Sequence, residues 1–182
     1  MQLVSRIFFL FLLLLSFNLK GQNSSDSLLI ELVHTNKLAA LDSIVNERNV
    51  NQLLGSTQEP LLFLAIQENN LEAVKLLIKK GAFIDILYND LNALMYCAVK
   101  GKTEIAEYLL EIGVNVNNLN SRRNTALIYA ARYGRTSFVK LLLDHGANTE
   151  IKNLTNLSAL DYAEKFSEVS IVTGKQIGRA HV

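Results

Sequence analysis

The residue types that most often carry out catalysis are few and scattered in this chain of 182 residues. It has three histidines, His34, His145 and His181, and none belongs to the His-Glu-x-x-His pattern of a zinc site. No Gly-x-Ser-x-Gly sequence is present to expose a nucleophilic serine on a sharp turn. Glu104 and Glu107 share a helical spacing that is typical of a solvated surface. We therefore expect no catalytic residue, no metal site, no cofactor and no enzymatic activity.

The clearest concentration of charge is a set of four arginines, Arg122, Arg123, Arg132 and Arg135. A basic strip on one surface favours an acidic partner, and ordinary solubilising charge is the alternative interpretation. The rest of the chain is not basic. When the four basic residues of the two chain ends are set aside, residues 22–173 carry a net charge of −3. This balance gives no indication of general nucleic-acid binding.

These arginines lie in a segment that repeats an earlier one. Residues 125–153 follow the pattern of residues 92–120 at a distance of 33 residues. The recurring positions of the earlier segment are Ala93, Leu94, Tyr96, Ala98, Gly101, Thr103, Leu109, Leu110, Gly113 and Asn115. A fixed period of this length indicates an array of stacked structural repeats.

Each repeat reads as two short helices. Apolar residues recur at helical spacing in both halves of the unit, and Thr125 stands where an N-cap hydroxyl is wanted. Gly113 and Gly146 follow leucine-rich segments, where a left-handed helix stop favours glycine. The single cysteine, Cys97, takes the repeat position of Ala130 and is expected to be a small buried apolar residue. One unit cannot bury its apolar face alone, so neighbouring units must supply the core.

The pattern T-A-L-x-x-A-A-x-x-G, followed by V-K-L-L-L and G-A-N, resembles the ankyrin repeat. Ala93 and Ala126 replace the proline of that family's signature, and Met95 and Ile128 replace its histidine. The resemblance implies an all-α ankyrin-repeat solenoid of helix-turn-helix units with β-hairpin fingers. It also implies a protein–protein interaction module, in which the finger tips and the first helices line a concave binding surface.

The resemblance covers residues 27–172. We divide this array into an N-terminal cap repeat (27–51), three regular repeats (59–91, 92–124 and 125–157) and a partial repeat (158–172). The first regular repeat is one residue short, and the missing residue is expected in the finger Phe83–Leu91. In the partial repeat, Ser170–Val172 aligns with the start of a second helix.

The fingers depart from the family at one position. Two residues before each helix cap, where the family usually has glycine, this chain has Asp90, Arg123 and Asn156. A different turn type that removes the strain of left-handed geometry is one interpretation. The other is that Arg122 and Arg123 are presented to a partner at a finger tip. The residues expected to contact a protein partner are Tyr88, Asn89, Asp90, Arg122, Arg123, Asn124 and Arg132.

Residues 1–21 read as a secretory signal peptide, and residues 22–26 as a polar spacer. The apolar stretch Ile7–Phe17 follows Arg6 and would span about 16 Å as a helix, against about 30 Å for a hydrocarbon slab. We expect cleavage before Gln22, because the cleavage site resembles those of signal peptides of Gram-negative bacteria. The mature protein is then expected to be periplasmic or secreted. We also expect it to be a monomer. An uncleaved tether is the alternative, and a mature product that begins at Gln22 would exclude it.

The end of the chain does not continue the repeat. Residues 173–182 have no leucines where the second helix requires them, and Gln176–Val182 is encodable by a string that resembles a common sequencing adapter. We therefore expect a non-native tail and a truncated C-terminus. The alternative function follows from this: the array would position a substrate in a longer exported enzyme or membrane protein. Sequencing the native gene past Val172 distinguishes the two.

Overall fold

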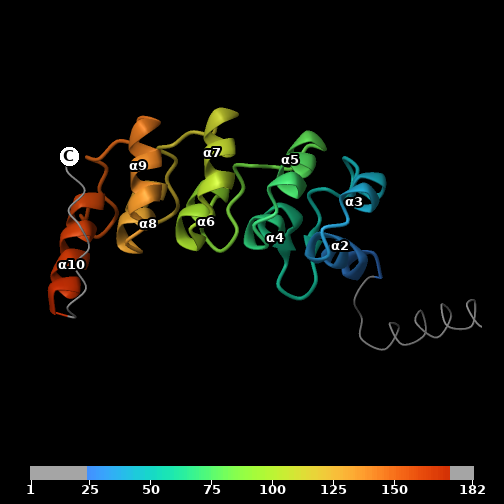
Figure 1. Cartoon of the computed structure of the whole chain (residues 1–182), viewed down its shortest axis with the longest axis horizontal. Coiled ribbons are helices and arrows are strands. Elements are labelled where there is room, and N and C mark those ends of the chain that lie inside the picture. Colours follow the sequence, from blue (N-terminus) through green and yellow to red (C-terminus); the bar gives the residue numbers. More distant parts are fainter. Residues whose placement is uncertain (1–23, 173–182) are drawn as a thin grey trace, which may run out of the picture.

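The computed structural model describes residues 24–172, with side chains from 25 to 165. Figure 1 shows the helices as a single row of stacked pairs, with the first helices in one layer and the second helices in the other. First helices pack on first helices, and second helices on second helices, in sequence order. This is the solenoid predicted from the 33-residue period. The predicted signal peptide, residues 1–21, and the suspected tail, residues 173–182, lie outside the described residues.

Each repeat contributes one helix to each layer. The first helices are α2 (Ser24–His34), α4 (Leu61–Gln67), α6 (Ala93–Lys100), α8 (Ala126–Arg132) and α10 (Ala159–Val172). The second helices are α3 (Leu38–Ile44), α5 (Leu71–Lys79), α7 (Thr103–Glu111) and α9 (Thr136–Asp144). Between residues 24 and 172, none of these helices combines the length and the apolar character needed to cross a membrane.

The helix boundaries are set by the residues that the sequence indicated. Asn92 Oδ1 accepts a hydrogen bond from Met95 N at 2.8 Å, and Thr125 Oγ1 accepts one from Ile128 N at 3.2 Å. Each of these caps satisfies a backbone donor that the first helical turn leaves free. At the other end of the repeat, the glycines at 81, 113 and 146 have φ values of 91°, 89° and 80°. These glycines end the second helices in left-handed geometry, as predicted.

A left-handed residue also separates the two helices of each repeat. Asn36, Asn69, Gly101 and Gly134 hold this place, with φ values of 52°, 56°, 72° and 62°. The next equivalent residue is Ser167, which has neither the freedom of glycine nor the tolerance of asparagine. Here the structure corrects the prediction that a second helix starts at Ser170–Val172, because α10 continues unbroken from Ala159 to Val172.

The core lies between the two layers and is continuous along the array. Most of each central first helix is buried: residues 61–66 of α4, 93–98 of α6 and 126–131 of α8. Cys97 is fully buried among them, and burial raises the pKa of its thiol. The prediction of a small buried apolar residue at this position is therefore confirmed.

The cap repeat has the two predicted helices but differs at its edges. Helix α2 begins at Ser24, inside the segment that we expected to be a spacer. Between α3 and α4 lies a short antiparallel pair, β1 (Leu53–Leu54) with β2 (Glu59–Pro60). Helix α3 ends when Val45 turns to extended geometry, without the glycine stop of the regular repeats.

Candidate functional site

The finger before α8 is a tight loop that displays two arginines. Asn120 N donates to Asn124 O at 3.1 Å, and Arg123 N donates to Asn120 O at 3.0 Å. Arg123 lies at a φ of 59°, close to the values of 65° for Asp90 and 59° for Asn156. The interpretation that a different turn removes the left-handed strain is therefore wrong. Arg122 and Arg123 are both exposed at this loop.

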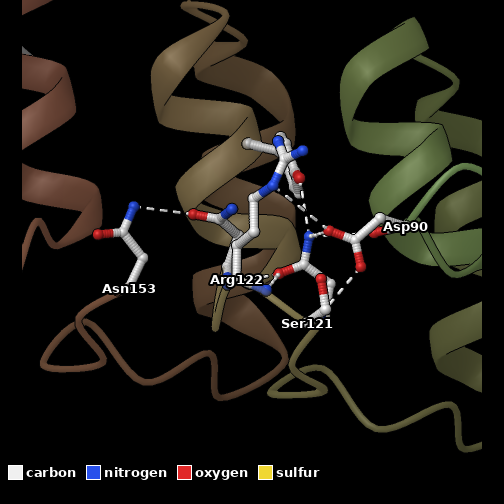
Figure 2. A network of polar contacts seen from close by, with 7 residues as sticks. Asp90, Ser121, Arg122 and Asn153 are labelled. Carbon is white, nitrogen blue, oxygen red and sulfur yellow. Dashed lines mark hydrogen bonds and ion pairs between the residues drawn. The ribbon is translucent and has the colours of Figure 1, made fainter. Parts of the chain in front are cut away.

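A buried asparagine holds this finger together. Asn120 is 5% exposed, and its Oδ1 accepts hydrogen bonds from Arg122 N at 3.1 Å and Asn124 N at 2.8 Å. Its Nδ2 donates to Asp90 Oδ2 at 3.0 Å and to Tyr129 Oη at 2.9 Å. Figure 2 shows this polar network between two successive fingers. One side chain therefore fixes the loop, the previous finger and the first helix behind it.

Asp90 is part of this network, which limits its availability to a partner. Its Oδ1 accepts a hydrogen bond from Ser121 N at 3.0 Å, and its Oδ2 lies 3.9 Å from Arg122 Nε (Figure 2). Hydrogen bonding from Ser121, followed by the charge of Arg122, holds the pKa of the Asp90 carboxyl below its ordinary value of 3.8. The predicted contact residue is thus a structural link that also orients one arginine.

The same arrangement recurs one repeat later and corrects another prediction. Asn153 Nδ2 donates to Asn124 Oδ1 at 2.9 Å and to Tyr162 Oη at 3.2 Å. Asn124 is 6% exposed, so it is not the partner contact that we expected. Its amide is used between fingers instead. The recurrence of Asn120 as Asn153 was the signal for this pair of buried asparagines, and our sequence reasoning missed it.

The two remaining finger residues of the prediction lie in the preceding finger. The ring of Tyr88 packs edge-on against Phe63, with centroids 5.3 Å apart, and lies 6.5 Å from the ring of Tyr96. Tyr88 is half-buried, so this ring is largely committed to packing. Asn89 is exposed at the turn, with a φ of 52°.

Cations and aromatic rings meet at the C-terminal ends of the first helices. The Arg132 guanidinium lies 6.0 Å from the ring centroid of Tyr133 and 5.9 Å from that of Tyr162. Lys100 Nζ lies 5.4 Å from the ring centroid of Tyr96. Cation–π contacts of this length hold the long side chains against the surface. We call Lys100, Arg132 and Tyr133, which are all exposed, the helix-end cluster.

The predicted basic strip is divided into two parts. Arg122 and Arg123, the finger pair, precede α8, whereas Arg132 is its last residue. All eight residues between, 124–131, are buried, and α8 itself rises about 10 Å. Arg135 packs its guanidinium against Gly101, where an added Cβ would lie 3.4 Å from Arg135 Cζ. The structure therefore brings together Arg135 and the turn of the previous repeat, but not the finger pair and the helix-end cluster.

The N-terminal part of the same helix layer has a different charge. Glu68 Oε1 lies 3.3 Å from His34 Nδ1, and burial raises the pKa of the Glu59 carboxyl. Burial, followed by the charge of Glu59, raises the pKa of Tyr96 to about 12. The Tyr96 hydroxyl therefore stays protonated and donates a hydrogen bond to Gln67 Oε1 at 2.9 Å. Acidic side chains thus lie near the ends of α4, whereas Lys100 and Arg132 are the last residues of α6 and α8.

The part of the chain from residue 24 to 172 contains no cluster of side chains suited to a metal ion. No group of three or more potential metal-ligating side chains is found there. Every buried side-chain nitrogen or oxygen of this part of the chain has a hydrogen-bond partner. Polar groups available for recognition in this part of the chain therefore lie at the surface.

Comparison with protein families gives two matches along the chain. A family model of ankyrin repeats in three copies matches residues 20–120, and a second one, of ankyrin repeats in many copies, matches residues 109–163. No curated protein matches the chain at a significant level.

Proposed function

Because the chain belongs to the ankyrin-repeat family, we propose that it binds an acidic segment of a partner protein on the first-helix side of its second and third regular repeats. Ankyrin repeats are generally protein–protein interaction modules. The partner would contact the helix-end cluster (Lys100, Arg132 and Tyr133) and the finger pair (Arg122 and Arg123). Binding, without catalysis and as a monomer, is the whole of the proposed activity.

The observation that carries this proposal is the separation of charge between the two helix layers. Residues 91–135 contain six basic side chains, all of them at the end of a first helix, in the turn after it or in a finger. The same residues contain three acidic side chains, and all three lie on the second helix α7. One side of the second regular repeat is therefore basic and the other acidic, while α9 of the third repeat carries one charge of each sign, Lys140 and Asp144. A surface of this kind steers an acidic partner to one face and repels it from the other.

The composition of the helix-end cluster supports the same surface. Arginine and tyrosine are the side chains most often found at the energetic centre of protein interfaces. Tyr133 and Arg132 are both exposed and contact each other, so a partner would meet a held pair. Less side-chain freedom is lost on binding when the groups are already in place.

The experiment is a comparison of charge-reversed variants. The double variant Arg122→Glu/Arg123→Glu and the single variant Arg132→Glu would be used, beside the wild type, to capture proteins from extracts of the source organism. The captured protein would be identified by mass spectrometry, purified and titrated. We expect each variant to weaken the affinity about tenfold or more, and the wild-type affinity to fall as salt rises.

The matched control changes the opposite face. Lys140→Glu makes the same charge change on the second helix α9, where Lys140 is exposed, and should leave the affinity unchanged. Circular dichroism would show that all variants fold. If Lys140→Glu weakened binding while the arginine variants bound as the wild type does, the second-helix layer would be the interface and the proposal would be wrong.

A further inference from the structure

A second surface of the molecule has an open groove that the proposed function does not use. It lies where the cap repeat meets the first regular repeat, beyond the ends of α3 and α5, and has a volume of about 790 Å³. This is within the usual range for ligand sites. Among its lining side chains are Glu47, Arg48, Lys79, Lys80 and Phe83.

The walls of this groove are fixed by internal contacts. Lys80 Nζ lies 2.7 Å from Asp42 Oδ1 and donates to Asp42 O at 2.9 Å, so α5 is joined to α3. Asn51 Oδ1 accepts from Phe83 N at 2.7 Å, and Asn51 Nδ2 donates to Gly81 O at 2.9 Å. The groove therefore keeps its shape without a ligand.

The loop on the cap side is equally well held. Asn49 Oδ1 accepts from Asn46 N at 2.8 Å, and Asn46 Oδ1 accepts from Arg48 N at 3.0 Å. The Asn49 amide also donates to Ile44 O at 3.0 Å. These bonds close a small turn that replaces the missing glycine stop and carries Arg48 at the rim of the groove.

Three groups in the groove are left without a structural task. The side chains of Arg48 and Lys79 make no hydrogen bond or ion pair within residues 24–172, although the charge of Lys79 adds to that of Lys80 in lowering the pKa of the Asp42 carboxyl. The side chain of Phe83 is 60% exposed, although its backbone is held by Asn51. Two unpaired cations therefore lie beside an exposed aromatic ring.

The other repeats show that the fold does not require these residues. Gly81, Gly113 and Gly146 are equivalent, so the position of Lys79 is held by Glu111 and Asp144 in the later repeats. The position of Phe83 is held in the same way by Asn115 and Asn148. Acidic and amide side chains thus serve this backbone equally well. The cationic and aromatic character belongs to this one groove.

We propose that the groove between the cap repeat and the first regular repeat binds an extended acidic peptide segment of a partner protein. Carboxylates of the segment pair with Arg48 and Lys79, and an adjacent apolar side chain packs on the ring of Phe83. This site is separate from the helix-end cluster and the finger pair, and it adds a second point of attachment to the array.

A peptide fits these groups better than a polyphosphate does. Phe83 offers an apolar contact that a phosphate chain does not use. A short peptide that alternates carboxylates with apolar side chains satisfies both kinds of contact.

The test uses the purified protein and a labelled peptide that alternates glutamate and leucine, with its glutamine–leucine counterpart as the uncharged probe. We expect saturable binding of the acidic peptide, measured by fluorescence anisotropy, and much weaker binding of the counterpart. Lys79→Glu should weaken the affinity about tenfold, and Phe83→Asn about threefold. Both substitutions install residues that later repeats already carry, so folding should be retained.

Two controls separate this site from the proposed function. Lys140→Glu makes the same charge change as Lys79→Glu outside the groove, and Arg122→Glu/Arg123→Glu removes the finger pair. Neither should change the affinity for the peptide by more than about twofold. Amide shifts in NMR spectra should move at residues around 48, 79 and 83. Binding that Lys79→Glu leaves intact, shifts confined to the finger pair, or no binding to the wild type would each overturn the inference.

Discussion

Two successive fingers occupy the same place in their repeats and are built differently. The finger before α6 turns through Asn89 and Asp90, both left-handed, and Tyr88 and Leu91 exchange backbone hydrogen bonds of 2.9 and 3.0 Å. This is the two-residue hairpin turn that needs positive φ at both central positions. The finger before α8 has three residues between Asn120 and Asn124, and only the last of the three is left-handed.

The difference follows from the single missing residue of the first regular repeat. In the longer finger the fifth residue before the helix cap is Asn120, whose buried amide bonds the loop that it begins. In the shorter finger the residue that closes the turn in this way is Tyr88, which bonds Leu91 through its backbone while its ring packs on Phe63. A two-residue turn closes its own backbone hydrogen bonds and leaves no donors for a side chain to satisfy. The deletion therefore replaces a turn held by the Asn120 side chain with a turn held by backbone hydrogen bonds.

The largest effect is expected from Asn120→Ala. The change leaves two backbone N–H groups and the Tyr129 hydroxyl without their partner in a buried place, which should lower the free energy of unfolding by about 3 kcal/mol. Urea denaturation followed by circular dichroism measures it. Leu87→Ala removes an exposed side chain from the shorter finger, serves as the control, and should cost less than about 1 kcal/mol. Equal losses in the two variants would show that the buried amide has no special role.

A smaller effect is expected from Asn153→Ala. Asn153 makes a similar set of bonds, but its partners Tyr162 and Leu157 are only partly buried, whereas Tyr129 and Asn124 are buried beside Asn120, so water can replace part of what is lost. We expect a loss of about 1.5 kcal/mol, concentrated at one side of the array, because repeats depend on their nearest neighbours. Hydrogen exchange should become faster in α10 and stay unchanged in α4. Uniformly faster exchange would contradict this assignment.

The smallest effect is expected from titration of Asp90. Its folded pKa lies below the ordinary value of 3.8, so the stability that it contributes is complete above the ordinary pKa. This contribution is lost as the pH falls through the folded pKa. Asp90→Asn should therefore reduce the stability difference between pH 6 and pH 3 relative to the wild type, as measured by thermal melting. An unchanged difference would mean that Asp42 and Asp161, whose pKa values are also lowered, account for the acid sensitivity.

Much of this comparison was within reach of the sequence. The missing residue was assigned to the finger Phe83–Leu91, and the structure places the shorter turn there. The candidate site was less accessible to prediction. Arg122, Arg123 and Arg132 were correctly expected to be exposed. Asn124 and Tyr88 were expected at the surface as well, but Asn124 is buried and the ring of Tyr88 packs against Phe63.

The sequence by itself determined the repeat length, the caps and the helix stops. Each of these depends on a side chain and a backbone group within a few residues, such as Thr125 with Ile128, or on the freedom of one residue such as Gly113. Only the tertiary structure decided which polar groups remain available to a partner. Asn124 is covered by Asn153 of the next finger, while Lys79 faces an open groove beside Arg48. Those outcomes depend on neighbours about 30 residues away, and a local pattern carries no information about which neighbour covers a side chain.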